Sequence, residues 1–114
     1  MNNVKIQGIA YPVKFSLNTK RLFCRQKGIE LFEMEQIFSK VTKDVSIDDI
    51  ENLGLFILTA IQEGHRKQGL KCGLILDDII EVMGDDPSFI AEVMDIYTFS
   101  EVPKVGETGD EKKK

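Results

Sequence analysis

The 114-residue sequence predicts a mainly α-helical (α+β) fold, in which an N-terminal β-hairpin packs on a compact bundle of about five helices. Apolar and polar residues alternate only near the N-terminus, whereas later apolar residues recur every three or four positions. The hydrophobic content of 42% suffices for one core, and domains of about 100–150 residues are the most common. We therefore expect one domain over residues 1–103 and a disordered, charged tail over residues 104–114.

The hairpin is predicted to turn at Gln7-Gly8. Pro12 lacks the N–H that a strand ladder requires, so its strand should lie at an edge or pair on its other side. Because an isolated hairpin is only marginally stable in water, its apolar face should lie on helices. That face consists of alternating residues, namely Val4, Ile6, Tyr11, Val13 and Phe15.

Two helices are predicted next, over residues 19–27 and 29–40. Ser16 or Asn18 can cap the first helix, because a short side-chain oxygen accepts a hydrogen bond from a free backbone N–H. Gly28 is placed to end it in the left-handed conformation. The second helix has apolar residues at helical spacing, namely Leu31, Met34, Ile37 and Phe38, and a loop is expected at residues 42–45.

The longest helix is predicted over residues 47–68. Ser46 and Asp49 have the spacing of a capping box, and Gly69 is placed to end the helix. Apolar residues occur nearly all round its middle, which predicts a central helix that is contacted on several sides. One stripe along it consists of Ile47, Ile50, Gly54, Ile57, Ile61 and His65.

The last part of the domain is predicted to contain a short helix over residues 77–83, stopped by Gly84, and a final helix over residues 87–100. Asp86-Pro87 is a strong helix start, with Asp as the N-cap and Pro in the first turn. The final helix has five residues predicted to be buried, namely Phe89, Ile90, Val93, Met94 and Tyr97.

The net charge of −4 conceals an asymmetry between two parts of the chain. Residues 1–43 contain eight Lys/Arg and three Asp/Glu, which gives a net charge of +5. Residues 44–103 contain three Lys/Arg and thirteen Asp/Glu, which gives a net charge of −10. Three interpretations are open: the two parts pack against each other within one fold, promote head-to-tail self-association, or steer the approach of a partner. Basic residues are too sparsely clustered to predict nucleic-acid binding.

Other sequence features limit the location and chemistry of the protein. No run of about 18 apolar residues predicts a membrane span, and no secretory signal pattern opens the chain, so a cytoplasmic protein is expected. For Cys24 and Cys72, two free thiols are favoured over one disulfide. His65 is the single histidine, and no sequence motif provides a nucleophile or acid to work with it. We expect it to be partly buried near the negative end of its helix.

The paired aspartates at 48/49, 77/78 and 85/86 could be read as metal ligands, but each pair stands at a helix start and lacks a calcium-loop pattern. Capping is therefore the favoured interpretation. No phosphate-binding or dinucleotide-binding glycine motif is present. The sequence thus predicts no catalytic, metal-binding or cofactor-binding residues and no enzyme, but a protein that binds another protein through exposed faces of the third and last helices.

The segments, taken in order, resemble the tail assembly chaperones of long-tailed bacteriophages and prophages. The similarity covers residues 4 to 100 approximately, and the chain differs from it in having basic residues just before Gly28. The motifs that carry it are Ile6 to Phe15 (IQGIAYPVKF), then Asn18, Leu22, Phe23 and Gly28, then Leu55 to Lys67, and finally Leu76-Asp77-Asp78-Ile79 and Asp86-Pro87.

The resemblance implies a non-enzymatic protein in the bacterial host cytoplasm that binds the tape measure protein, keeps it soluble and helps to recruit tail tube subunits. It also suggests that the codons of Lys112-Lys113-Lys114 form a ribosomal frameshift site. The simpler alternative is that these lysines belong to an ordinary charged tail that increases solubility. Two alternatives remain. One is a structural virion protein, such as a head–tail or tail adaptor that oligomerises into the particle, and the other is a small regulatory or enzymatic domain of the host.

Overall fold

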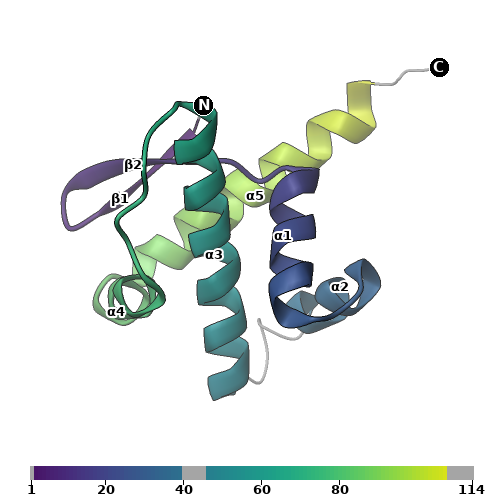
Figure 1. Cartoon of the computed structure of the whole chain (residues 1–114), viewed down its shortest axis with the longest axis horizontal. Coiled ribbons are helices and arrows are strands. Elements are labelled where there is room, and N and C mark those ends of the chain that lie inside the picture. The colour runs from purple at the N-terminus through teal and green to yellow at the C-terminus, as the bar shows by residue number, and fades with distance from the viewer. Residues whose placement is uncertain (1, 40–45, 108–114) are drawn as a thin grey trace.

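The computed structural model of the chain describes residues 2–39 and 46–107, of which 38–39 and 99–107 are described by their backbone alone. Figure 1 shows a two-stranded hairpin and several helices arranged around one long helix. This arrangement confirms the predicted mainly α-helical fold with an N-terminal hairpin. Its elements are β1 (Asn2–Ile6), β2 (Ile9–Val13), α1 (Leu17–Lys27), α2 (Leu31–Ser39), α3 (Ile47–Lys67), α4 (Leu76–Asp85) and α5 (Pro87–Glu107).

The hairpin turns where the sequence predicts, at Gln7 and Gly8. Their φ angles of 53° and 82° are the left-handed conformations that a type I′ turn requires. Pro12 lies in β2, which is an edge strand because the sheet has two antiparallel strands. Directly after β2, the Lys14 N–H donates to the Ala60 carbonyl of α3 at 3.0 Å. The hairpin is therefore fixed on α3, as its marginal intrinsic stability requires.

α1 begins at Leu17, slightly earlier than predicted. Ser16 is its N-cap, since the Ser16 Oγ accepts from the Thr19 N–H at 3.3 Å. The other predicted cap, Asn18, lies inside the helix and its side chain reaches α3 instead. Gly28 ends the helix with a φ of 70°, which confirms the predicted left-handed C-cap.

α2 differs from its prediction at the N-terminal end. It begins at Leu31 rather than residue 29, because the Glu33 carboxylate accepts from the Glu30 N–H at 2.8 Å and so caps the helix there. Met34 is fully buried as predicted, but Leu31 and Phe32 remain 43% and 62% exposed. Leu31 and Met34 thus stand at helical spacing, as the sequence indicates, but only Met34 is buried.

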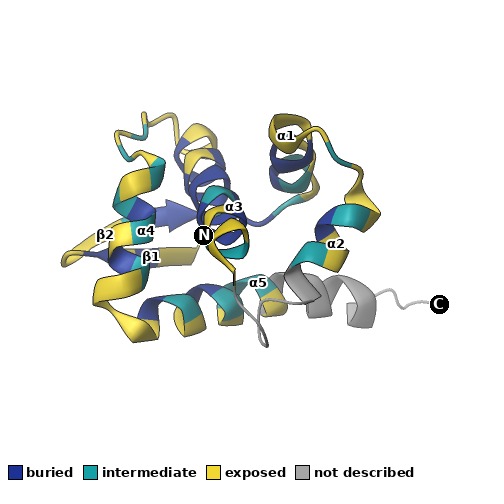
Figure 2. Cartoon of the chain, turned by 90° about the horizontal axis from the view of Figure 1, so that it is seen from below, coloured by how far each residue is buried: buried dark blue, intermediate teal, exposed yellow. Residues whose placement is uncertain are grey.

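α3 occupies the centre of the fold. The predicted capping box is present: the Ser46 Oγ accepts from the Asp49 N–H at 3.1 Å, and the Asp49 carboxylate accepts from the Ser46 N–H at 3.1 Å. Most residues from Asn52 to His65 are buried, which confirms the central position (Figure 2). Ile47 is 71% exposed and does not belong to the buried stripe, because the first helical residue protrudes beyond the elements packed on α3.

α4 is longer than the helix predicted over residues 77–83. It continues through Gly84 to Asp85, so Gly84 does not stop it. A single glycine costs a helix only about 1 kcal/mol relative to alanine, which the packing of an amphipathic face outweighs. The Asp86 carboxylate then accepts from the Ser88 N–H at 3.1 Å, which confirms the helix start predicted at Asp86-Pro87.

α5 is also longer than predicted, since it continues past residue 100 to Glu107. Residues 104–107 are consequently helical, which corrects the predicted boundary of the disordered tail. An existing helix lengthens without a new nucleation step, so Pro103 removes one hydrogen bond without ending it. The predictions for residues 108–114, for the loop at 42–45 and for the side chain of Phe38 lie outside the described part of the chain.

The core lies where the hairpin, α1, α4 and α5 meet α3. An aromatic cluster joins α1, α3, α5 and the segment that follows β2, with ring centroids 5.3 to 5.6 Å apart in tilted or edge-to-face arrangements that aromatic rings favour. The four rings are Phe15, Phe23, Phe56 and Tyr97. Among residues 2–39 and 46–107, no helix has the length and apolar character needed to cross a membrane.

Candidate functional site

The most deeply buried charged side chain is that of Glu63 on α3, which is 2% exposed. Its carboxylate accepts from the Asn18 amide of α1 at 2.8 Å and from the Arg66 guanidinium at 2.8 and 2.7 Å. Asn18 in turn accepts from Arg21 at 3.0 and 2.7 Å. A chain of polar contacts therefore joins the surface of α1 to the interior side of α3.

These contacts determine the ionisation of Glu63. The hydrogen bond from Arg66 lowers the pKa of the Glu63 carboxyl to about 2, assisted by the hydrogen bond from Asn18, while burial acts in the opposite direction. The carboxylate is thus charged at neutral pH and its oxygens are occupied by donors. This arrangement suits a structural link between two helices, since a general acid or base needs a pKa near the operating pH.

His65 is more deeply buried than the sequence predicts and is bound to its own helix. Its Nδ1 lies 2.7 Å from the Ile61 carbonyl oxygen, and because a carbonyl only accepts, Nδ1 carries the hydrogen in this contact. The imidazole ring lies beside the Tyr11 ring, with centroids 5.9 Å apart. The adjacent Gly64 lies directly against the backbone of β2. His65 therefore belongs to the contact between α3 and the hairpin.

The aspartate pairs behave as the capping interpretation predicts. Within each pair, one carboxylate accepts from a backbone N–H at a helix start: Asp49 from Ser46, Asp78 from Ile75, and Asp86 from Ser88. Among the described residues, no three His, Cys, Asp or Glu side chains lie close enough together to hold a metal ion.

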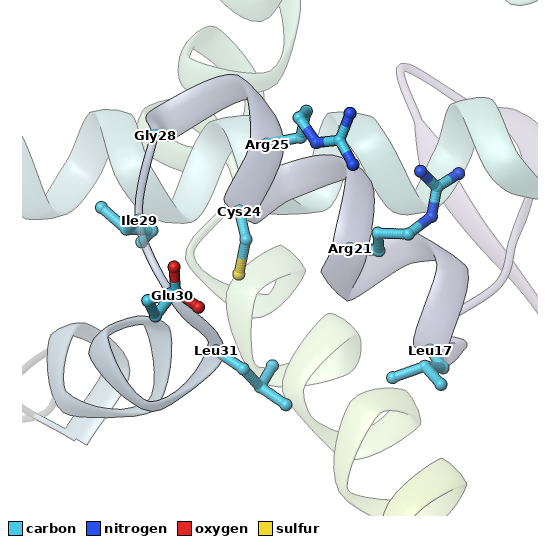
Figure 3. A pocket seen from close by; sticks show the side chains of 8 residues that line it. All are labelled: Leu17, Arg21, Cys24, Arg25, Gly28, Ile29, Glu30 and Leu31. Atoms are coloured by element: carbon cyan, nitrogen blue, oxygen red, sulfur yellow. The ribbon is translucent and has the colours of Figure 1, made fainter.

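An open groove runs between α1 and α2 (Figure 3). Its volume is about 470 Å³, which is within the range of small binding sites. Cys24 and Leu31 point into the space between the two helices, whereas the guanidinium groups of Arg21 and Arg25 extend from one side of α1. The lining residues are Leu17, Arg21, Cys24, Arg25, Gly28, Ile29, Glu30 and Leu31.

Exposed apolar side chains surround this groove, which we call the α1–α2 groove. Of its lining residues, Leu17 is 70% exposed and Leu31 is 43% exposed, and Phe32, which follows Leu31 in the sequence without lining the groove, is 62% exposed. Large side chains of this kind are individually common on surfaces, but a group of them at one concave site is typical of a protein-binding surface. The α1–α2 groove is therefore the candidate functional site.

The segments on the two sides of the α1–α2 groove carry opposite charge, and Arg21, Arg25 and Glu30 are the charged residues of these segments that line it. α1 has basic residues and no acidic one, whereas the segment from residue 30 to 39 has acidic residues and no basic one. The basic set is Lys20, Arg21, Arg25 and Lys27, and the acidic set is Glu30, Glu33 and Glu35. A helix that binds here would have an apolar ridge, acidic residues toward α1 and basic residues toward α2.

Cys24 lies at the floor of the α1–α2 groove and is 9% exposed. Burial raises the pKa of its thiol, and the nearby carboxylates of Glu30 and Glu33 raise it further. Thiolate formation is disfavoured by both effects, and the thiolate is the nucleophilic form. Cys24 is thus a packing residue in its present surroundings, and both Cys24 and Cys72 are free thiols.

The sequence predicted contact surfaces on the third and last helices, but the groove lies between α1 and α2. α3 is buried on almost all sides and has few exposed apolar residues to offer. The sequence contains one sign of this surface, the adjacent apolar residues Leu31 and Phe32. Two neighbouring residues of a helix do not both fit on one narrow buried face, so at least one of them is expected to be exposed. Both residues are exposed in the structure.

Comparison with models of protein families, with characterised proteins and with solved structures finds no match to this chain.

Proposed function

We propose that the chain is a non-enzymatic tail assembly chaperone of a long-tailed bacteriophage or prophage, which binds the tape measure protein and helps to recruit tail tube subunits. The proposal combines the motif resemblance from Ile6 to Asp86-Pro87 with the α1–α2 groove. It places the protein in the cytoplasm of the bacterial host, where tails assemble.

The observation that carries the proposal is the exposure of Leu17 and Leu31 in an open groove, with the exposed Phe32 next to Leu31 in the sequence. Tape measure proteins are long helical chains, and an amphipathic helix buries its apolar ridge by lying in such a groove. The opposite charges of the segments on the two sides would fix the direction in which that helix lies. Masking the ridge in this way keeps a long helical chain from aggregating.

The test is coexpression with the tape measure protein that is encoded near this chain. We expect the tape measure protein to move into the soluble fraction and to purify together with the chain. Leu31→Asp/Phe32→Asp should abolish both effects, because it places two charges where the apolar ridge has to be buried. The matched control is Leu70→Asp, which changes a leucine that is 53% exposed in the connector between α3 and α4.

Two results would contradict the proposal. One is a tape measure protein that stays equally insoluble with and without the chain. The other is the presence of the chain in purified virions, measured by mass spectrometry, since a chaperone leaves before the particle is complete. The second result would favour a structural adaptor instead.

A further inference from the structure

The α1–α2 groove combines exposed apolar residues with charges that are not neutralised. Leu17 and Leu31 line it, and Leu31 points into the space between the two helices (Figure 3). Arg25 and Glu30 line it as well, and both are exposed. Neither of these two charged side chains has an ion-pair partner in the part of the chain that the structure describes. Such a surface suits a protein partner that carries the reverse arrangement of charge.

A second copy of the chain carries that reverse arrangement. α1 is basic without an acidic residue, and the segment from residue 30 to 39 is acidic without a basic one. When two identical grooves face each other about a two-fold axis, α1 of one copy lies either on α1 or on α2 of the other. The first arrangement sets like charges together, whereas the second sets basic residues on acidic ones at both contacts. The groove is therefore self-complementary in the second arrangement, in which the axis runs along the groove.

The charged lining residues lie at matching levels for this contact. Arg25 is in the last turn of α1, and Glu30 directly precedes α2, so both lie at the end of the groove where the two helices are linked. Rotation about an axis leaves positions along that axis unchanged. An axis along the groove therefore brings Arg25 of each copy to Glu30 of the other, so that each of these charges meets one of opposite sign.

We propose that two copies of the chain associate through their α1–α2 grooves as a closed dimer, with α1 of each copy on α2 of the other. Closing the two grooves covers the leucines that line them, and burial of apolar surface favours the contact. The charges at the rim select the orientation, since exposed ion pairs contribute little to affinity. A two-fold contact uses the same surface on both copies, so association stops at the dimer.

The dimer occupies the groove that the proposed function assigns to a partner helix. Self-association would then keep the exposed leucines covered until a partner is present, and the partner would separate the two copies. The inference needs only the open groove and its charges, so it does not rest on the proposed function. Self-association is measured on the chain alone, whereas the proposed function is tested by coexpression, so failure of one is distinguishable from failure of the other.

The first measurement is the molar mass of the full chain by sedimentation equilibrium, at about 0.01 M ionic strength and over protein concentrations up to about 1 mM. We expect the mass to rise with concentration and to level off at twice that of the monomer. A mass that stays monomeric at every concentration would overturn the proposal. A mass that continues to rise beyond two copies would overturn the closed two-fold contact.

The second measurement exchanges the two facing charges. Arg25→Glu and Glu30→Lys should each weaken self-association about tenfold or more, because each sets like charges against one another at both contacts. An equimolar mixture of the two variants should associate again, since each supplies the charge that the other has lost. Both changes in one chain should also restore the dimer. A mixture that stays monomeric, or single variants that dimerise as before, would refute the assigned surfaces.

Two control variants separate this contact from an effect of net charge. Lys71→Glu and Glu92→Lys make the same changes of charge at exposed positions outside the groove and should leave self-association nearly unchanged. If they weakened it as much as Arg25→Glu and Glu30→Lys do, net charge and not the groove would control association, and the proposal would fail. Circular dichroism checks that every variant is folded.

The apolar part of the contact is tested by Leu17→Asp. Leu17 is 70% exposed and begins α1, where a carboxylate suits the positive end of the helix dipole, so the chain should remain folded. We expect this variant to weaken self-association about tenfold or more, because it places a charge inside the closed groove. Leu70→Asp, at a 53% exposed position outside the groove, is the matched control. Equal association of the two leucine variants would refute the proposal.

Discussion

Asn18 on α1 donates a hydrogen bond to the carboxylate of Glu63 on α3, at 2.8 Å and across 45 positions of sequence. The other end of the same amide accepts from Arg21, so both of its polar atoms are engaged. An amide held at both ends fixes the orientation of α1 on α3. Because α1 forms one wall of the α1–α2 groove, this contact also positions the candidate site.

The first prediction concerns the charge of Glu63. Glu63→Gln should lower the free energy of unfolding by about 1.5–3 kcal/mol, because hydrogen bonds to a charged group are lost or weakened inside the fold. Urea unfolding at pH 7, followed by circular dichroism, measures this change. Glu92→Gln, at an exposed position of α5, is the matched control and should leave stability nearly unchanged. An equal midpoint for the Glu63 variant and the original chain would argue against a buried, donor-occupied carboxylate.

The second prediction concerns pH. The pKa of Glu63 is lowered in the folded state to about 2 from an ordinary value of 4.5, so the folded state favours the charged form. The resulting stability is fully present above pH 4.5 and is lost as the pH falls toward 2. The difference in unfolding free energy between the original chain and Glu63→Gln should therefore shrink over that interval. If this difference in unfolding free energy stayed constant from pH 6 to pH 2, the ionisation of Glu63 would not be its cause.

Much of the fold could be predicted from the sequence, because the relevant signals are local. Three features illustrate this: the left-handed turn at Gln7-Gly8, the helix end at Gly28, and the capping box of Ser46 and Asp49. Each of them depends on residues only a few positions apart. The ends of α4 and α5 could not be predicted in the same way. Gly84 and Pro103 lower the helical preference only locally, and whether a helix continues past them depends on packing that no single residue encodes.

The candidate site was harder to predict than the fold. Glu63 stands in a helix segment with charged neighbours and would ordinarily be assigned to the surface, but its burial depends on Asn18 of a distant segment. Leu31 is the first residue of α2, and its exposed position follows from this start, which lies two residues after the predicted start at residue 29. Tertiary contacts thus determined both features, whereas periodicity alone determined the identity of the helices.

The third prediction concerns the two thiols. Cys24 is buried with a raised pKa, whereas Cys72 is only half-buried in the connector before α4. We expect iodoacetamide to modify Cys72 first and Cys24 at a rate at least about tenfold lower, because burial restricts both access to the Cys24 thiol and its ionisation. Mass spectrometry of timed samples at pH 8 measures the two rates. In denaturant the difference should disappear, and equal rates in the native protein would contradict the burial of Cys24.

The fourth prediction concerns Gly64 on α3. A Cβ at this position would lie 2.5 Å from the Pro12 carbonyl oxygen and 2.8 Å from the Val13 nitrogen. Both atoms are backbone, so no side-chain rotation can relieve the contact, and β2 would have to move away from α3. Gly64→Ala should therefore lower the free energy of unfolding by about 1–3 kcal/mol, even though alanine is the better helix former.

Two other helical glycines separate the steric effect from helix preference. At Gly54 the nearest atoms are side-chain carbons of Leu76 and Ile80, at 3.1 and 3.2 Å, which can shift slightly. At Gly84 nothing lies within 4 Å, so Gly84→Ala should raise stability by up to about 1 kcal/mol. The expected order of urea midpoints is Gly84→Ala highest, Gly54→Ala intermediate and Gly64→Ala lowest. If Gly64→Ala were as stable as Gly84→Ala, the hairpin could not lie on α3 at the distance described, and the contact that holds it there would have to be assigned elsewhere.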